Sequence, residues 1–191
     1  MSGRQALFLD RDGVINVDHG YVCAPERTEF IDGIFELCRA ARQAGHLLVV
    51  ITNQAGIGRG YYSEQQFLDY MDWMRAEFRQ RGVPLDAVYH CPHHPTEAVG
   101  EYRRECDCRK PAPGMILRAE RELCLDLARS TLVGDKPSDI AAGRAAGVGS
   151  CIQIAPSRAP GAVSGLVITE ADRQRVLASL NPDATSRDQK N

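Results

Sequence analysis

Two carboxylates stand one residue apart near the start of the chain, in Asp10-Arg11-Asp12-Gly13, directly after the apolar run Ala6–Leu9. A strand that ends in such a pair directs both acids to the crevice at its carboxyl end, where open α/β sheets bind their ligands. There, one acid can attack phosphorus while the other gives and takes a proton. Because Asp and Gly also gather in ordinary turns, the residues that follow must decide between a turn and a catalytic pair.

Metal-ligand side chains form two pairs with i, i+2 spacing in an otherwise polar stretch. In extended chain this spacing puts both side chains of a pair on the same side, so the two pairs can close a tetrahedral Cys₃His site for Zn²⁺. We do not expect His90 or His94 to be ligands, because His90 faces away from its neighbour Cys91 and His94 does not share the i, i+2 spacing. A site closed by four protein ligands is structural and pins its loop. The pairs are Cys91 with His93 and Cys106 with Cys108.

The chain has seven cysteines and no export signal, which favours a metal site or buried thiols over a disulfide framework. For the two pairs above, the alternative to zinc is a set of buried thiols with surface histidines. The other cysteines lie on or near apolar stretches, so we expect them to fill the core. They are Cys23, Cys38, Cys124 and Cys151.

Three further polar segments lie where strands are predicted to end. Thr52-Asn53-Gln54 brings a hydroxyl and amides to the crevice, Arg109-Lys110 follows the last zinc-ligand candidate, and Gly134–Asp139 supplies carboxylates. Singly, each has an ordinary interpretation, as a helix cap, a solvated surface pair or a turn with a helix start. Together with Asp10 and Asp12, these segments place the parts of one phosphoryl-transfer site at the ends of four strands.

The elements that must position these residues alternate between strand and helix. Buried apolar runs predict strands over 6–10, 47–52, 86–91 and 131–134, with two more short candidates over 150–155 and 166–169. Between them, helical spacing begins at Ile34, a capping box is formed by Ser63 and Gln66, and an Ala-rich helix can end at Gly147. This alternation predicts an α/β fold, doubly wound, with a mainly parallel sheet and helices on both faces.

The domain organisation follows from length and composition. The 191 residues suit one domain over 1–180, with the zinc loop at about 91–110 and a polar, flexible tail over 181–191. A net charge of −2 argues against nucleic acid as the main partner. No run is long enough to cross a membrane, and no signal-peptide core follows the N-terminus. We therefore expect a cytoplasmic monomer that interacts with neither membrane nor nucleic acid.

The motifs, in this order, resemble those of the haloacid dehalogenase superfamily: Asp10-Arg11-Asp12-Gly13-Val14, Thr52, Lys110, and Gly134-Asp135 with Asp139. The resemblance covers about the first 155 residues and implies a Mg²⁺-dependent phosphatase that works through an aspartyl-phosphate. Asp10 would be the nucleophile, and Asp12 would protonate the leaving group and then activate water. Asp10, Asp135 and the carbonyl of Asp12 would hold Mg²⁺. Thr52 and Lys110 would bind the phosphoryl oxygens, and Asp139 is either an outer neighbour of the metal or a helix cap.

No separate cap domain fits between these motifs, so loops must select the substrate. The zinc-loop pattern is similar to that of a branch of small phosphatases whose substrates are a sugar bisphosphate or histidinol phosphate. By that similarity the substrate contacts are Asp18, His19, Gly20, Tyr21, Thr52, Asn53, Gln54, Ala55, Arg109, Lys110 and Lys136.

A bisphosphate is the favoured substrate, because the fork of Arg109 recognises phosphate oxygens at two points. The amine of histidinol phosphate would instead favour a site with acidic side chains. Asp18 is such a residue, so histidinol phosphate stays an alternative substrate. A zinc-stabilised binding module without catalysis is a third hypothesis, and the complete set of motif residues argues against it. A 3′-phosphatase for DNA ends is a fourth, and the lack of a basic groove argues against it.

Overall fold

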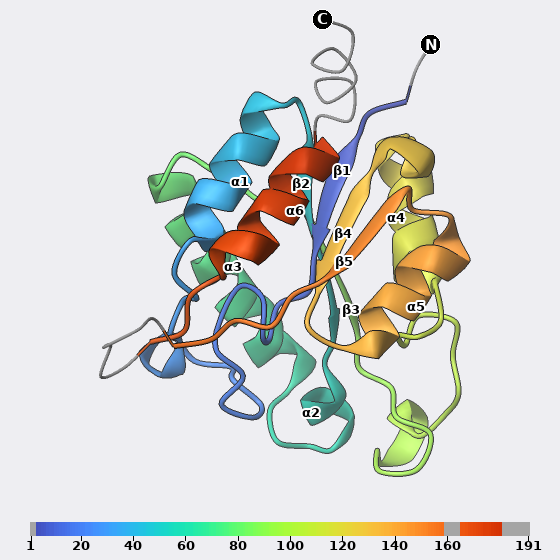
Figure 1. Cartoon of the computed structure of the whole chain (residues 1–191). Helices are drawn as coiled ribbons and strands as arrows, with labels where there is room; N and C mark the ends of the chain where they lie inside the picture. The colour runs from blue at the N-terminus through green and yellow to red at the C-terminus, as the bar shows by residue number, and fades with distance from the viewer. Residues whose placement is uncertain (1–2, 159–164, 181–191) are drawn as a thin grey trace, which may run out of the picture.

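The computed structural model describes residues 3–158 and 165–180. Its centre is a five-stranded, fully parallel sheet with the strand order β3-β2-β1-β4-β5 (Figure 1). The predicted apolar runs form these strands because parallel sheets bury aliphatic side chains on both faces. The strands are β1 Ala6–Leu9, β2 Leu47–Asn53, β3 Ala87–Cys91, β4 Thr131–Gly134 and β5 Ser150–Gln153.

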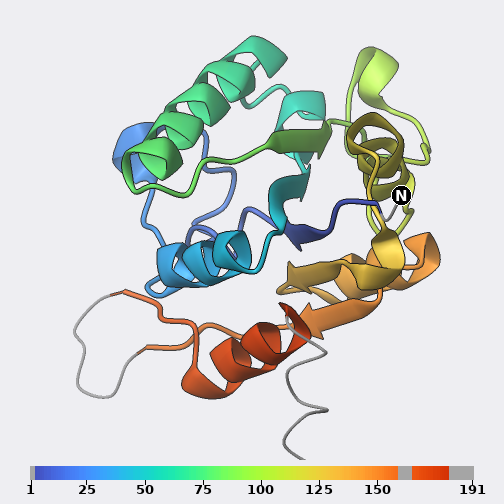
Figure 2. The ribbon, with the colours of Figure 1, turned by 90° about the horizontal axis from the view of Figure 1, so that it is seen from above.

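Two helical layers cover the sheet, as the view from above shows (Figure 2). Successive side chains of β1 alternate between them: Leu7 and Leu9 pack with one layer, Ala6 and Phe8 with the other. This arrangement confirms the predicted doubly wound α/β fold. The first layer contains α1 Ile34–Gln43, α3 Glu64–Gln80 and α6 Glu170–Leu180; the second contains α4 Gly114–Leu123 and α5 Pro137–Ala146.

Local sequence signals set several helix ends. Ser63 Oγ accepts a hydrogen bond from the Gln66 N–H (3.1 Å) and Gln66 Oε1 accepts one from the Ser63 N–H (2.7 Å), which confirms the capping box. Helix α5 ends at Gly147, whose φ of 84° suits glycine. The connections contain four short helical segments. They are η1 Pro25–Arg27, α2 Ala55–Gly58, η2 Gly100–Tyr102 and η3 Leu127–Arg129.

The strand order places a switch point beside β1. The chain builds outward from β1 to β2 and β3, then crosses to β4 and β5 on the other side. Ligand crevices form where neighbouring strands lead away in opposite directions, here between the carboxyl ends of β1 and β4. In the described part of the chain the insertions after β1 and β3 are loops with short helical turns, as expected without a separate cap domain. No described helix is long and apolar enough to span a bilayer.

The predicted strand over 166–169 is wrong. Val167 forms only isolated bridges, to Asp32 and to Ser157, because its backbone partners lie in two loops and not on the edge strand β5. Helix α6 follows directly and was not predicted. The hydroxyl of Thr169 accepts a hydrogen bond from the Asp172 N–H at 3.1 Å, which gives the start of this helix an N-terminal cap.

The cysteine expectations hold only in part. Cys38 is buried, and Cys23 and Cys151 are half-buried. The expectation for Cys124 is wrong: it is exposed where α4 ends and adopts a left-handed backbone with a φ of 53°, so it closes the helix and does not fill the core. The tail over 181–191 lies outside the described residues.

Candidate active site

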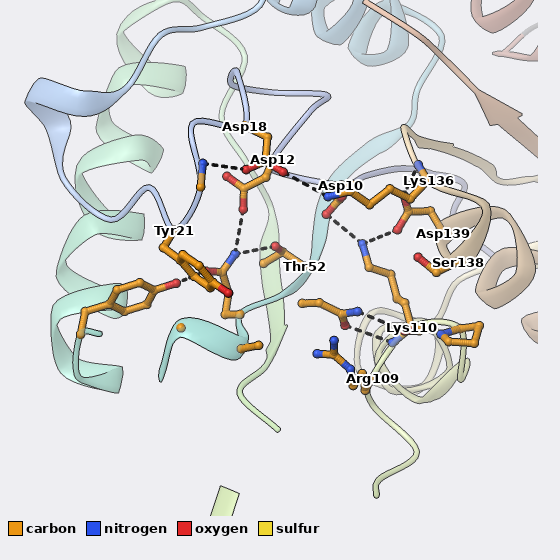
Figure 3. Close-up of a pocket in the computed structure, with 17 residues that line it drawn as sticks. Asp10, Asp12, Asp18, Tyr21, Thr52, Arg109, Lys110, Lys136, Ser138 and Asp139 are labelled. Carbon is orange, nitrogen blue, oxygen red and sulfur yellow. Dashed lines mark hydrogen bonds and ion pairs between the residues drawn. The ribbon is translucent and has the colours of Figure 1, made fainter. Parts of the chain in front are cut away.

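A cavity of about 630 Å³ opens at the carboxyl ends of β1, β2 and β4 (Figure 3). It coincides with the switch point of the sheet, and most residues predicted for the site line it. These are Asp10, Asp12, Asp18, Gly20, Tyr21, Thr52, Asn53, Gln54, Ala55, Arg109, Lys110 and Lys136.

Asp10 lies at the floor of the cavity, where it is 6% exposed. Lys110 Nζ is 2.8 Å from Asp10 Oδ1 and 2.7 Å from Asp139 Oδ1, and it donates to the Ile51 carbonyl at 3.0 Å. Burial raises the pKa of Asp10, and the Lys110 ammonium opposes that rise. A buried carboxylate beside a fixed lysine can act as a nucleophile toward a phosphate, because the lysine offsets the repulsion between the two anions.

Asp12 reaches the same cavity as Thr52, and the amide of Gln54 joins the two. Gln54 Nε2 donates to Asp12 Oδ2 at 3.2 Å and to Thr52 Oγ1 at 2.7 Å, and the Tyr62 hydroxyl donates to Gln54 Oε1 at 2.7 Å. Thr52 is only 1% exposed. The second acid and the buried hydroxyl therefore share one wall of the cavity.

Asp135, which follows β4, meets Asp10 and Asp139 so that one oxygen from each lies within 4.8 Å of the others. Both oxygens of Asp139 are engaged, Oδ1 with Lys110 and Oδ2 with the N–H of Lys136 at 2.9 Å. Asp139 thus orients Lys110 and caps the first turn of α5. A cation would therefore be shared between Asp10 and Asp135.

Asp135 has the properties of a metal ligand. Its Oδ1 is buried without a hydrogen-bond partner among the described residues. Burial and the charge of Asp10 raise the pKa of Asp135 to about 7. Gly13 allows this approach, since a Cβ there would lie 2.2 Å from Asp135 Oδ2. An unpartnered oxygen between two carboxylates fits a hard divalent cation such as Mg²⁺.

The four predicted zinc ligands come together, and their ligand atoms all lie within 4.8 Å of one another. Cys91 Sγ is 3.0 Å from Cys108 Sγ and 3.5 Å from Cys106 Sγ, and His93 Nδ1 is 3.4 Å from Cys108 Sγ. Burial raises the pKa of the Cys91 thiol, so its thiolate needs a cation nearby. Three sulfurs and one imidazole in so compact a set fit Zn²⁺.

The zinc loop and β2 together position the cations of the site. Arg109 Nη1 donates to the carbonyl of His93, a zinc-ligand candidate, at 3.1 Å. Asn53 binds the backbone of Lys110 with both ends of its amide, donating to the carbonyl at 3.1 Å and accepting from the N–H at 3.0 Å. Asn53, predicted as a substrate contact, therefore has a clear role in fixing Lys110.

Residues 18–21 form another part of the wall. Asp18 Oδ1 accepts from the Gly20 N–H at 3.1 Å, and Asp18 Oδ2 is 3.2 Å from Lys136 Nζ (Figure 3). Tyr21 adopts a φ of 51°, and its ring packs edge-on against Tyr61 with centroids 4.6 Å apart. The ion pair links the loop after β1 to the start of α5 beside the entrance.

Three histidines lie away from both the cavity wall and the zinc cluster. His19, a predicted substrate contact, pairs with Glu29 at 3.1 Å and does not line the cavity. His90 and His94 face Glu64 and Glu97, and neither joins the ligand cluster, as expected from the spacing.

Some lining residues were missed. Pro111 and Ser138 lie within motifs already singled out, so their neighbourhood could have revealed them. Gly56 directly follows the predicted contact Ala55, whereas Tyr62 carries no sequence signal. A Cβ on Gly56 would lie 2.5 Å from the ring of Tyr62, so the ring occupies the space that glycine leaves.

This combination of fold and site is that of the phosphatases of the haloacid dehalogenase (HAD) superfamily. A family model described as HAD-hydrolase-like matches residues 107–152. A Burkholderia mallei protein named D-glycero-alpha-D-manno-heptose-1,7-bisphosphate 7-phosphatase is 52% identical over 95% of this chain and 98% of its own length. A Vibrio cholerae protein, named as the phosphatase of the beta form, is 51% identical over 79% of this chain and 81% of its own. The chain belongs to this family of heptose-bisphosphate phosphatases and is a phosphoric monoester hydrolase.

Solved structures agree with this assignment. The D,D-heptose 1,7-bisphosphate phosphatase from B. bronchiseptica, crystallised with magnesium and phosphate, has a TM-score of 0.72 at 28% identity and covers 96% of this chain and 99% of its own. A HAD-like phosphatase from Mesorhizobium loti has a TM-score of 0.83 at 33% identity, over 95% of this chain and 88% of its own.

Proposed function

We propose that this chain removes the 7-phosphate of D-glycero-D-manno-heptose 1,7-bisphosphate and leaves the 1-phosphate. The product would supply nucleotide-activated heptose for lipopolysaccharide or cell-surface glycans. The names of the relatives that match most of the chain support this substrate. The observation that carries the chemistry is Lys110, held between Asp10 and Asp139 at the floor of the cavity.

The two acids would divide the reaction. An oxygen of Asp10 forms a bond to phosphorus as the ester P–O bond breaks, and Asp12 gives its proton to the leaving sugar oxygen. Asp12, now a carboxylate, then takes a proton from water as the water attacks phosphorus. The Asp10–phosphorus bond breaks and inorganic phosphate leaves. Thr52 and Lys110 hold the phosphoryl oxygens, on which charge is spread in the transition state.

Both metals have suitable residues. Asp10, Asp135 and the carbonyl of Asp12 would hold Mg²⁺, which supplies positive charge beside the transferring phosphoryl group. Cys91, His93, Cys106 and Cys108 would hold Zn²⁺, which keeps its loop folded.

The charges at the entrance favour a substrate with two phosphates. Arg109 and Lys136 line the cavity in addition to the buried Lys110, so one phosphate can lie at the floor while the second meets a cation. The amine of histidinol phosphate would face these same cations. The remaining predicted sugar contacts are Asp18, Gly20, Tyr21, Gln54 and Ala55. The cytoplasmic location and the monomeric state stay predictions from the sequence.

Phosphate release from four substrates in parallel tests the assignment: the heptose bisphosphate, fructose 1,6-bisphosphate, histidinol phosphate and a 3′-phosphorylated oligonucleotide. We expect the highest kcat/KM for the heptose bisphosphate, in each of its two anomers. Preference for histidinol phosphate or for the oligonucleotide would refute the sugar substrate.

The covalent step has its own test. Asp10→Asn removes the nucleophilic oxygen at nearly constant volume, so turnover should fall to a trace while the circular dichroism spectrum stays unchanged. Asp32→Asn, in a loop outside the cavity, is the matched control. Substantial activity in Asp10→Asn would exclude the aspartyl-phosphate.

A further inference from the structure

Arg11 is the largest side chain without exposed surface in the described part of the chain, although it stands between the two acids of the site. Its guanidinium binds Asp12 at both oxygens: Nε and Nη2 donate to Oδ1 at 3.2 and 2.8 Å, and Nη2 donates to Oδ2 at 2.7 Å. Nη2 also donates to the carbonyl of Val22 at 2.7 Å. A cation that has lost all its water is thus committed to one carboxylate.

Apart from Asp12 and the Val22 carbonyl, the guanidinium of Arg11 faces aromatic rings. The guanidinium carbon lies 5.7 Å from the centre of the Phe67 ring and 5.2 Å from that of Tyr70, both on α3. Nη1 is buried without a partner among residues 3–158 and 165–180. Buried ion pairs add little to stability, because desolvation offsets the attraction, and well-packed apolar side chains often replace them without loss. A contribution to folding is therefore a poor explanation for this arginine.

We propose that Arg11 is a positioning residue that fixes the carboxylate of Asp12 for proton transfer to the leaving group. This inference rests on the proposed function, in which Asp12 carries that proton. Asn16 Nδ2 also donates to Asp12 Oδ1 at 3.0 Å, and Gln54 Nε2 donates to Oδ2 at 3.2 Å. Donors on both oxygens restrict rotation of the carboxylate, and such restriction keeps a catalytic group in its reactive geometry.

The same guanidinium reaches the loop after β1. Val22, whose carbonyl it binds, directly follows the segment that carries Asp18 and Tyr21 into the cavity. Loss of Arg11 would therefore also loosen substrate contacts. A test of proton transfer must therefore compare two substrates that lose these contacts equally, so that the effect on substrate binding cancels in the ratio of their kcat/KM values.

Two aryl phosphates of similar shape provide that test. Phenyl phosphate has a basic leaving group that needs a proton, whereas p-nitrophenyl phosphate has an acidic leaving group that departs without one. The values of kcat/KM report the step up to cleavage of the ester bond, so their ratio isolates the proton donor. In Asp12→Asn this ratio, phenyl over p-nitrophenyl, should fall by about 100-fold.

For Arg11→Met we expect the ratio to fall by about tenfold or more, and for Arg11→Lys, which keeps a charge but loses the two-point contact, by a smaller factor. Arg42→Met is the matched control. Arg42 pairs with Asp86 at 3.0 Å outside the cavity, so its loss should lower the melting temperature and leave the ratio unchanged.

The outcomes separate the two hypotheses. An unchanged ratio in Asp12→Asn would refute the acid role of Asp12 and with it the proposed mechanism. A fall in Asp12→Asn with a wild-type ratio in the Arg11 variants would refute positioning by Arg11 alone. If Arg11→Met does not fold, the kcat/KM ratio of Arg11→Lys provides the same test, because this variant retains the buried cation.

Discussion

Asp135 approaches the end of β1 because Gly13 has no side chain. Gly13 adopts a φ of 89°, and a Cβ there would overlap the Asp135 carboxylate. Residue 13 must therefore adopt a left-handed backbone and also leave space for the Asp135 carboxylate. These two requirements can be separated, because other glycines of the chain have a similar φ but open space around them.

Gly13→Ala should lose both stability and affinity for Mg²⁺. The left-handed backbone costs an alanine about 1 kcal/mol of unfolding free energy, and displacement of Asp135 should weaken Mg²⁺ binding by about tenfold or more. Gly45→Ala is the control: Gly45 has a φ of 85° with no atom within 4 Å of its Cβ position. It should lose stability alone. Titration calorimetry with Mg²⁺ and urea unfolding measure the two effects, and equal Mg²⁺ affinity in both variants would contradict this explanation.

Stabilisation by Mg²⁺ should increase with pH. Without metal, the pKa of Asp135 is raised from 3.8 to about 7, so the folded state holds a proton that the unfolded state releases. The stability that this proton provides is complete below the unfolded pKa and is lost as the pH rises through about 7. Mg²⁺ offsets the loss, because it binds the ionised carboxylates.

The rise in melting temperature on adding Mg²⁺ to metal-free protein should therefore be larger at about pH 8 than at about pH 5. Asp135→Asn removes the titrating group and should abolish the dependence. The same rise at both pH values in the unsubstituted protein would count against Asp135 as the group responsible.

Sequence reasoning identified most of the residues that line the cavity. Asp10, Asp12 and Thr52 stand where predicted strands end and carry groups that suit phosphate chemistry, whereas Asp18, Gly20 and Tyr21 were named only because of the family resemblance. Sequence reasoning gave Arg11 no role, since arginine side chains are rarely buried without an exposed end. The role of Asp139 stayed open for a related reason. Its position in the first turn of α5 indicates a cap, and only the fold shows that its other oxygen meets Lys110.

At the scale of elements, the loop over 91–110 connects the Cys₃His cluster to Arg109, for which we propose a contact with the second phosphate. The His93 carbonyl holds Arg109, and Cys108 directly precedes Arg109 in the chain. Removal of zinc should therefore disturb the second phosphate site before it disturbs the floor, where Asn53 and Ile51 of β2 hold Lys110.

Cys108→Ser should raise KM for the heptose bisphosphate by about tenfold, the loss expected for one charge-assisted contact. KM for p-nitrophenyl phosphate, which has one phosphate, should change far less. Cys151→Ser, in β5 and outside the cluster, is the control. Zinc content by mass spectrometry completes the test, and equal changes of KM for both substrates would refute the link through Arg109.

The elements themselves were predictable to different degrees. The strands that lead to the site are short apolar runs with polar ends, a pattern that only a buried parallel strand explains well. Helix α6 lacks a comparable signal, because Val176 and Leu180 are its main buried apolar residues. The 166–168 segment has the composition of a strand, but its hydrogen bonds go to Asp32 and Ser157 in loops, a pairing that no local pattern reveals.

In the molecule as a whole, the apolar layer that contains α1, α3 and α6 includes a cluster of three aromatic rings, and none of the three lines the cavity. Phe78 is fully buried and packs against Phe35 and Phe30, with ring centroids 5.0 and 6.1 Å apart. The cavity lies at the carboxyl edge of the sheet. We therefore expect a substitution in the aromatic cluster to lower stability without changing the rate of catalysis.

Phe78→Ala should lower the free energy of unfolding by about 3–5 kcal/mol, while kcat measured well below the melting temperature stays close to that of the unsubstituted protein. Urea unfolding and assays at low temperature measure both. A large fall in kcat in a folded variant would show that the aromatic cluster also acts on the site.

The cations of the cavity are unequally exposed, and this has a kinetic consequence. Lys110 is 4% exposed at the floor, whereas the side chain of Lys136 is 52% exposed and Arg109 is half-buried. The exposed charges act on an approaching bisphosphate through solvent and are screened by salt, whereas the buried lysine acts only after contact. Added salt should therefore slow the encounter with substrate and lower kcat/KM, while kcat, which reflects events inside the filled cavity, stays nearly constant.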